Sequence, residues 1–194
     1  MVKKKPAFTL VELLIVIAII GIMASFIIIN TRNSQSRARD IQRAADLVAL
    51  DDAINKYYRE TGHYPDLPDG CGTNGSNGVS SDAVTRWATG NCLTPTGYIQ
   101  NLVSKYLPKL PVDAGPQIYQ DDRAIRGFVY FHSRVNPPQN IECYKIMAFN
   151  PENPRLNQYK SIWDPARDGG TNDNIVDGAN VWAWSKYSQG CAAK

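Results

Sequence analysis

The sequence predicts an α+β protein in which one long N-terminal helix packs on a small antiparallel sheet. A long apolar run near the start passes into a polar segment with helical spacing, and no proline occurs between residues 8 and 60. Short runs of aromatic and β-branched residues, which favour strands, follow in the second half of the chain. At 194 residues, the chain has room for about one globular unit besides the helix.

The run from Phe8 to Ile29 has the length and apolarity of a membrane-spanning helix. Lysines at positions 3–5 precede it, so its start is expected in the cytoplasm and the rest of the chain outside. No clean small-residue cleavage site follows the run, and we therefore expect the helix to be retained. Glu12 is the only ionisable residue within it, and a charge in such a helix requires a neutralising partner.

Residues 3–13, with the sequence KKKPAFTLVEL, resemble the cleavage and assembly motif of type IV prepilins and type II secretion pseudopilins. The resemblance implies that a prepilin peptidase cuts between Ala7 and Phe8 and that the new Phe8 amine is N-methylated. It also implies that Glu12 pairs with the Phe8 ammonium of a neighbouring subunit, since a cationic amine can compensate a carboxylate inside an apolar bundle. Ala7 stands where glycine is usual in the family, which we expect to slow cleavage rather than abolish it.

The resemblance further implies the type IV pilin fold and a division of the chain into four parts. These are a cleaved leader at 1–7, a transmembrane and filament-core half of the helix at 8–29, an amphipathic half at 30–61 and an extracytoplasmic globular region at 62–194. The implied partners are identical or related pilin subunits, the prepilin peptidase, the pilus or secretion assembly machinery and the membrane. The protein would cross the cytoplasmic membrane once before assembly, and would then form an extracellular or periplasmic filament.

The helix is predicted to continue through the polar segment to about Tyr58. Gly62 suits the left-handed position after a helix, and Pro65 cannot continue one. Residues 57–65 also resemble the helix exit of pseudopilins and related pilins. Intervals of three and four residues predict one apolar stripe that packs on the domain. Its members are Ile41, Ala44, Ala45, Leu47, Val48, Leu50, Ile54, Tyr57 and Tyr58.

The remaining segments predict a loop, a short helix and a sheet. Residues 66–91 are rich in Gly, Asn, Ser and Asp and indicate an irregular loop. Residues 98–107 indicate a short helix that a following proline ends. The runs at 127–132 and 141–149 indicate a hairpin with a proline-containing turn, and the run at 180–185 is a candidate third strand.

The chain has four cysteines, Cys71, Cys92, Cys143 and Cys191, without metal-ligand spacing. An even number favours disulfides, which persist in oxidising compartments, although buried free thiols in a reducing cell are the alternative. A Cys71–Cys92 bridge would close a loop of about twenty residues and stabilise the fold by roughly 3 kcal/mol. The second bridge would then join Cys143 to Cys191, but four cysteines allow three pairings, and all three stay open.

Residues 164–177 concentrate side-chain oxygens in a Gly-rich loop. Calcium accepts such ligands, and some pseudopilins carry calcium near the C-terminal sheet. The spacing does not fit an EF-hand, and the pattern favours a solvated loop over a calcium site. Asp168, Asp173 and Asp177 are the candidate ligands, and no other cofactor is predicted.

The pattern of reactive residues predicts a structural protein and not an enzyme. His63 and His132 are the only histidines, and neither lies near a catalytic motif. The net charge of +3 without a clustered basic face argues against a nucleic-acid surface. The leading hypothesis is therefore a subunit of a type IV pilus or pseudopilus. The alternative is a signal-anchored extracytoplasmic binding or adhesion protein that keeps residues 1–7 and does not assemble. Adhesion, motility, secretion and DNA uptake share this architecture.

Overall fold

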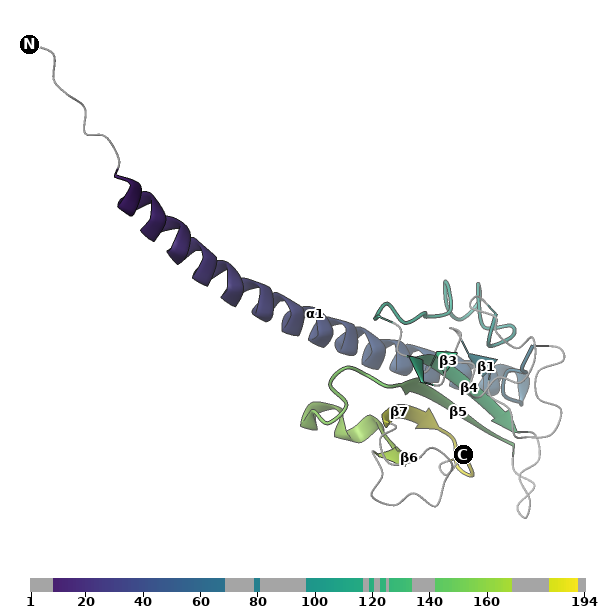
Figure 1. The fold of residues 1–194 in the computed structure, drawn as a ribbon. Helices are drawn as coiled ribbons and strands as arrows, with labels where there is room; N and C mark the ends of the chain where they lie inside the picture. Colours follow the sequence, from purple (N-terminus) through teal and green to yellow (C-terminus); the bar gives the residue numbers. More distant parts are fainter. Residues whose placement is uncertain are drawn as a thin grey trace, which may run out of the picture. The chain divides into compact units, whose positions relative to one another are not determined.

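The computed structural model divides the chain into two compact units, residues 1–38 and 39–194. One helix, α1, runs from Leu10 to Thr61 and contributes to both units. Figure 1 shows α1 and the strands of the second unit. The structure describes residues 9–68, 79–80, 97–116, 119–120, 123–124, 126–133, 142–168 and 182–191.

The end of α1 confirms the predicted exit, one turn later than Tyr58. Gly62 follows the helix with a φ of +83°, the left-handed conformation that glycine adopts at least cost. The Gly62 N–H donates to the Tyr58 carbonyl at 2.8 Å, and the Thr61 hydroxyl donates to the Tyr57 carbonyl at 2.8 Å. These two bonds satisfy the Tyr57 and Tyr58 carbonyls in the last turn of the helix.

The second half of α1 packs one face on the sheet, and this face is narrower than the predicted stripe. Ile41, Val48 and Tyr58 are 58%, 45% and 40% exposed, so their prediction as core residues was wrong. Ile41 and Val48 lie almost opposite Leu50 around the helix, where spacing alone could not show which side meets the sheet. The buried apolar residues of this half are Leu47, Leu50, Ala53, Ile54 and Tyr57.

The main sheet is antiparallel and has five strands in the order β1-β4-β5-β7-β6. Its strands are β1 (Val79–Ser80), β4 (Gly127–Ser133), β5 (Cys143–Phe149), β6 (Trp163–Asp168) and β7 (Trp182–Tyr187). The predicted pairing of the runs at 127–132 and 141–149 is confirmed, and the run at 180–185 does join them, beside β5. The proline-containing turn and most of the 66–91 loop lie outside the described residues.

Three smaller elements complete the second unit. β2 (Tyr119–Gln120) and β3 (Arg123–Ala124) form a separate two-stranded ribbon. The 3-10 helix η1 (Asn157–Ile162) precedes β6 and buries Tyr159 and Ile162. These elements and β6 were not predicted from the sequence.

Both faces of the central strands are buried, which gives the unit its core. Every residue of β4 and β5 is buried. Side chains of one face, such as Tyr130 and Ile146, form one cluster with Leu50 of α1. Val129 and Met147 alternate with them and belong to a second cluster on the other face. The α+β fold with a long helix on an antiparallel sheet is therefore the predicted one.

The predicted short helix at 98–107 is wrong. Asn101 and Ser104 have φ values of 59° and 77°, and such left-handed residues interrupt a right-handed helix. The segment instead forms a series of turns, with one isolated bridge from Val103 to Leu107. The segment still contributes an apolar side chain to the core, because Leu102 is fully buried there.

Candidate functional site

The first half of α1 exposes large apolar side chains around its whole circumference. The exposed fractions range from 46% for Val16 to 80% for Leu10. The five consecutive residues 13–17 are all exposed, so every face of this helix segment is open. A helix that is apolar on all sides is stabilised when lipid or other protein covers it. This uncovered segment, residues 10–23, is the first part of the candidate site.

The second part is the start of α1, where Thr9 and Glu12 form a capping box. The Thr9 N–H and hydroxyl both donate to Glu12 Oε2, at 2.9 and 2.8 Å. The Glu12 N–H donates to the Thr9 hydroxyl oxygen at 3.2 Å. This reciprocal arrangement satisfies N–H groups of the first turn, and the helix dipole favours a carboxylate there. The sequence analysis missed this motif, although the spacing Thr-x-x-Glu before an apolar run indicates it.

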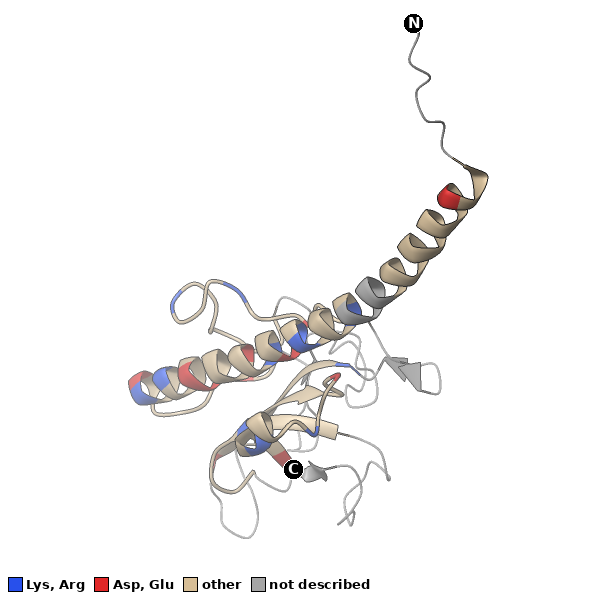
Figure 2. Cartoon of the chain, turned by 90° about the vertical axis from the view of Figure 1, so that its left-hand side faces the viewer, with Lys and Arg blue, Asp and Glu red and all other residues tan. Residues whose placement is uncertain are grey.

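Glu12 therefore lies at the very beginning of the uncovered segment. Figure 2 shows an acidic position near the start of α1, followed by a long part without charged side chains. Ala7 and Phe8, the predicted cleavage residues, lie outside the described residues. The cleavage point and the pairing of Glu12 stay predictions.

Among the residues that the structure describes, no helix has both the length and the apolarity needed to cross a membrane.

A buried ion-pair network begins where the second unit begins. Arg43 on α1 donates from Nε and Nη2 to the two carboxylate oxygens of Asp113, at 2.6 and 2.7 Å. Its Nη1 also donates to Asp40 at 2.5 Å and to Glu152 at 3.2 Å. Arg43 and Asp40 are only 2% and 0% exposed. Burial of a charge is costly unless partners compensate it, and here three carboxylates do so.

Arg39 completes this network from the preceding turn of α1. Its Nε and Nη2 donate to the two Glu152 carboxylate oxygens, both at 2.7 Å. These bonds lower the pKa of Glu152 and raise that of Arg39. Burial lowers the pKa of Arg43, but its hydrogen bonds to Asp113 and Asp40 outweigh this and leave the pKa above the ordinary value.

The network holds two distant loops on the helix. Asp113 belongs to the segment before β2, and Glu152 follows β5. Asp40 also accepts the backbone N–H of Glu152 at 2.9 Å and that of Asn153 at 2.7 Å. All these groups stabilise the fold, and the sequence analysis identified none of them. Arg39, Asp40 and Arg43 are a charged cluster on a helix face, which is the signal that could have found them.

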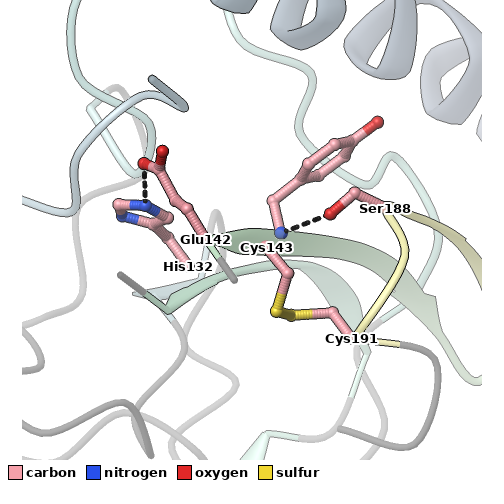
Figure 3. Close-up of a disulfide and its surroundings, with 6 residues drawn as sticks. His132, Glu142, Cys143, Ser188 and Cys191 are labelled. Carbon is pink, nitrogen blue, oxygen red and sulfur yellow. Dashed lines mark hydrogen bonds and ion pairs between the residues drawn. A yellow bond between two sulfur atoms is a disulfide. The ribbon is translucent and has the colours of Figure 1, made fainter. Parts of the chain in front are cut away.

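The end of the chain is fixed by a disulfide between Cys143 in β5 and Cys191 (Figure 3). This confirms one of the pairings that the sequence left open. The Tyr144 N–H donates to the Ser188 hydroxyl oxygen at 3.0 Å, and the Ser188 N–H donates to the Tyr144 carbonyl at 3.0 Å. The segment after β7 is therefore tied to β5 covalently and by hydrogen bonds. Cys71 and Cys92 lie outside the described residues.

The buried His132 on β4 has structural partners. Figure 3 shows His132 and Glu142 directed toward one another, with 2.8 Å between Nε2 and Oε1. Asp66 lies 3.7 Å from the other ring nitrogen. Glu142 also accepts the Tyr64 backbone N–H at 3.0 Å. The imidazole therefore connects the sheet to the segment that follows α1. His63, the other histidine, is exposed in that segment.

The calcium prediction is not resolved by the described residues. Asp168 is the last residue of β6, and Asp173 and Asp177 lie outside the described part of the chain. Within the described part, no group of three or more His, Cys, Asp or Glu side chains is placed to hold a metal ion. Calcium binding by these aspartates stays a prediction.

Comparison with known proteins identifies the start of the chain. Residues 2–28 match the prokaryotic N-terminal methylation motif. The chain is 37% identical over 62 residues to the type II secretion system core protein G of Escherichia coli strain K12, covering 32% of this chain and 43% of that protein. It is 34% identical over 68 residues to the core protein G of Vibrio cholerae, covering 35% and 47%.

A type IV pilin is also similar. The chain is 34% identical over 89 residues to the type IV major pilin protein PilA of Myxococcus xanthus, covering 46% of this chain and 40% of that protein. The chain thus spans less than half of the length of these relatives. No solved structure matches it.

The matched motif contains both the capping box and the uncovered segment of α1. The start of the chain thus carries a prokaryotic N-terminal methylation motif, and part of the chain is similar to type II secretion core protein G and to the type IV pilin PilA.

Proposed function

We propose that the chain is a structural subunit of a type IV pilus or pseudopilus that assembles through the apolar half of α1. Residues 10–23 carry this proposal, because they expose apolar side chains on every face and require cover. Sister subunits supply that cover in a filament, and lipid supplies it before assembly. The globular unit, which has its own core, remains outside the membrane in both states.

Processing would create the second component of the site. A prepilin peptidase cuts between Ala7 and Phe8, and the new Phe8 amine is methylated. That amine is cationic near neutral pH, and Phe8 directly precedes Thr9 in the sequence. Glu12 of one subunit then pairs with the Phe8 ammonium of its neighbour. The capping box supports this role, because two bonds from Thr9 fix the Glu12 carboxylate at the helix start.

The pair would give assembly its register. A carboxylate surrounded by apolar helices is costly unless a cation lies beside it, so only alignments that bring the two together are favourable. The subunit would cross the cytoplasmic membrane once before assembly. Its partners are identical or related subunits, the prepilin peptidase and the pilus or secretion assembly machinery.

Intact-mass measurement of the membrane-extracted chain, expressed with a prepilin peptidase, tests the processing step. Cleavage between Ala7 and Phe8 removes seven residues, and methylation adds one methyl group. A mature chain that still begins at Met1 would instead support a signal-anchored binding or adhesion protein. Purified fibres seen by electron microscopy test the assembly step.

Two substitutions separate the charge of Glu12 from its capping role. Glu12→Gln keeps the capping box, because glutamine also serves at this position, but it removes the charge. We expect it to leave insertion and cleavage intact and to abolish fibres. Thr9→Val removes the capping hydroxyl but keeps the carboxylate, and we expect fibres to form. Normal fibres from Glu12→Gln would refute the ion pair.

A further inference from the structure

A shallow apolar groove of about 570 Å³ lies on the second unit, between α1 and η1. On the helix side its lining side chains are small, which lets another helix approach closely. The lining residues are Ala44, Ala45, Val48, Ala49, Asp52, Gln158, Tyr159, Ser161 and Ile162. Val48 is 45% exposed, and Ile41, two turns earlier on the same face, is 58% exposed. This is the part of the predicted stripe that the sheet does not cover.

Asp52 places a charge at one end of the groove. It lies one turn after Val48 on the same helix face. It is exposed and makes no hydrogen bond or ion pair within the part of the chain that the structure describes. The groove therefore combines an apolar floor with a carboxylate that is available to a partner.

The first unit carries the complementary features. Residues 10–25 of α1 are exposed, and Arg32 is the first cation that follows Glu12 in the sequence. Arg32 is exposed and, among the described residues, has no hydrogen bond or ion pair. An apolar helix followed by an available cation matches an apolar groove that ends in an available carboxylate.

We propose that the groove binds the apolar half of α1 from a second copy of this chain, with Arg32 of the second copy paired to Asp52. This inference rests on the proposed filament function and specifies which surfaces meet. Asp52 comes 20 residues after Arg32, so two parallel helices in this register are displaced by about 30 Å along their axes.

The same register is favourable along the rest of the groove. It places Gly21 of the second copy beside Ile41, which is exposed on α1 about one turn before the groove begins at Ala44. It also places Ala24 of the second copy beside Ala44, where two small side chains allow close approach. Small residues of the second copy thus face Ile41 and Ala44 in this register.

Other pairings with Asp52 are less favourable. If Arg37 of a parallel copy were the partner, Asn33 would lie against Val48. If Arg32 of an antiparallel copy were the partner, Ser36 would take that place. Each alternative puts a polar side chain on the exposed valine, so the parallel register with Arg32 is favoured.

A charge exchange tests the pair. In the full chain with its assembly machinery, Arg32→Glu and Asp52→Arg should each lower fibre yield by about tenfold, because each places like charges together. The double variant should restore fibres. Arg37→Glu is the matched control, and combining it with Asp52→Arg should not restore fibres. Unchanged thermal unfolding and insertion of each variant would show that folding is intact.

A cross-link tests the register. Ala24→Cys and Ala44→Cys, introduced together, should join neighbouring subunits in oxidised fibres, whereas either cysteine alone should not. Normal fibres from both single charge variants, or no restoration in the double variant, would overturn the inference while leaving the filament function intact. A cross-link from the cysteine of Ala44→Cys to a molecule other than a neighbouring subunit would also overturn the inference. An uncleaved wild-type chain without fibres would instead refute the proposed function.

Discussion

Replacing Arg43 with methionine should destabilise the second unit more than any other single change in the ion-pair network. Methionine fills similar volume but carries no charge, so buried carboxylates lose their cation. Asp113 loses two hydrogen bonds of 2.6 and 2.7 Å, and Asp40 loses one of 2.5 Å. Glu152 is less affected, because Arg39 still donates two bonds to it.

The expected cost follows from the burial of these groups. Removing one partner of a buried ion pair costs about 3–5 kcal/mol. For a unit of this size, that corresponds to a fall in Tm of about 10 °C. The Asp40 and Asp113 side chains are 0% and 3% exposed, so water cannot replace Arg43 without rearrangement.

Near-ultraviolet circular dichroism of the full chain in detergent is a suitable assay. All Trp and Tyr residues lie after residue 39, so the Trp and Tyr bands report the second unit alone. Arg39→Met is the matched control. The Arg39 side chain is 27% exposed, and we expect its loss to cost about 1 kcal/mol. If Arg43→Met lowers Tm no more than Arg39→Met, the network does not carry the stability assigned to it.

The same experiment has a pH dependence. Bonds from Arg39 lower the pKa of folded Glu152, so its stabilisation is full above the unfolded pKa of about 4.3 and is lost as pH falls through the folded pKa. The difference in Tm between wild type and Arg39→Met should therefore narrow as pH falls from 7 toward 3.

Two further changes probe the packing of the second unit. Replacing Cys143 and Cys191 together with alanine should cost about 4 kcal/mol in the free energy of unfolding, measured by urea titration, because the bridge closes a separation of 48 residues. Gly115→Ala should cost about 1–3 kcal/mol in a thermal scan, because a Cβ there would lie 2.1 Å from Nη2 of Arg43 and 2.9 Å from Oδ1 of Asp113.

The control for Gly115→Ala is Gly97→Ala, since a Cβ at Gly97 would have nothing within 4 Å. Equal stability of the two variants would contradict the close packing inferred at Gly115. For the disulfide, an unchanged urea midpoint would be the contrary result. If dithiothreitol still changes the urea midpoint of the double variant, that change would report the predicted Cys71–Cys92 bridge.

Local signals made much of the fold predictable from the sequence. The helix end could be placed because Gly62 and Pro65 act on their own backbone. The central strands could be found because their residues favour strands wherever they pair. β6 was missed because it contains Pro165 and charged residues, which argue against a strand. Its place at the edge of the sheet is where a proline is tolerated.

The long-range contacts were not predictable. Arg43 binds Asp113, which is 70 residues away in the sequence, and Glu152, which is 109 residues away. No local sequence pattern indicates contacts between residues so far apart. The buried side of the apolar stripe could not be predicted either, because Ile41 and Leu50 are equally apolar. Only the position of the sheet decides which of them is buried. The predicted motif at Glu12, in contrast, lies within a few residues of sequence.

The position of β7 in the sheet has a consequence for when the protein can fold. β7 lies near the end of the sequence, yet it is an interior strand between β5 and β6. Until it arrives, one edge of β5 is unpaired, and β6 lacks the strand that joins it to the sheet. Because a chain is synthesised from its N-terminus, this sheet can be completed only after almost all of the chain has been made. The strand order therefore delays completion of the sheet until synthesis of the chain is nearly over.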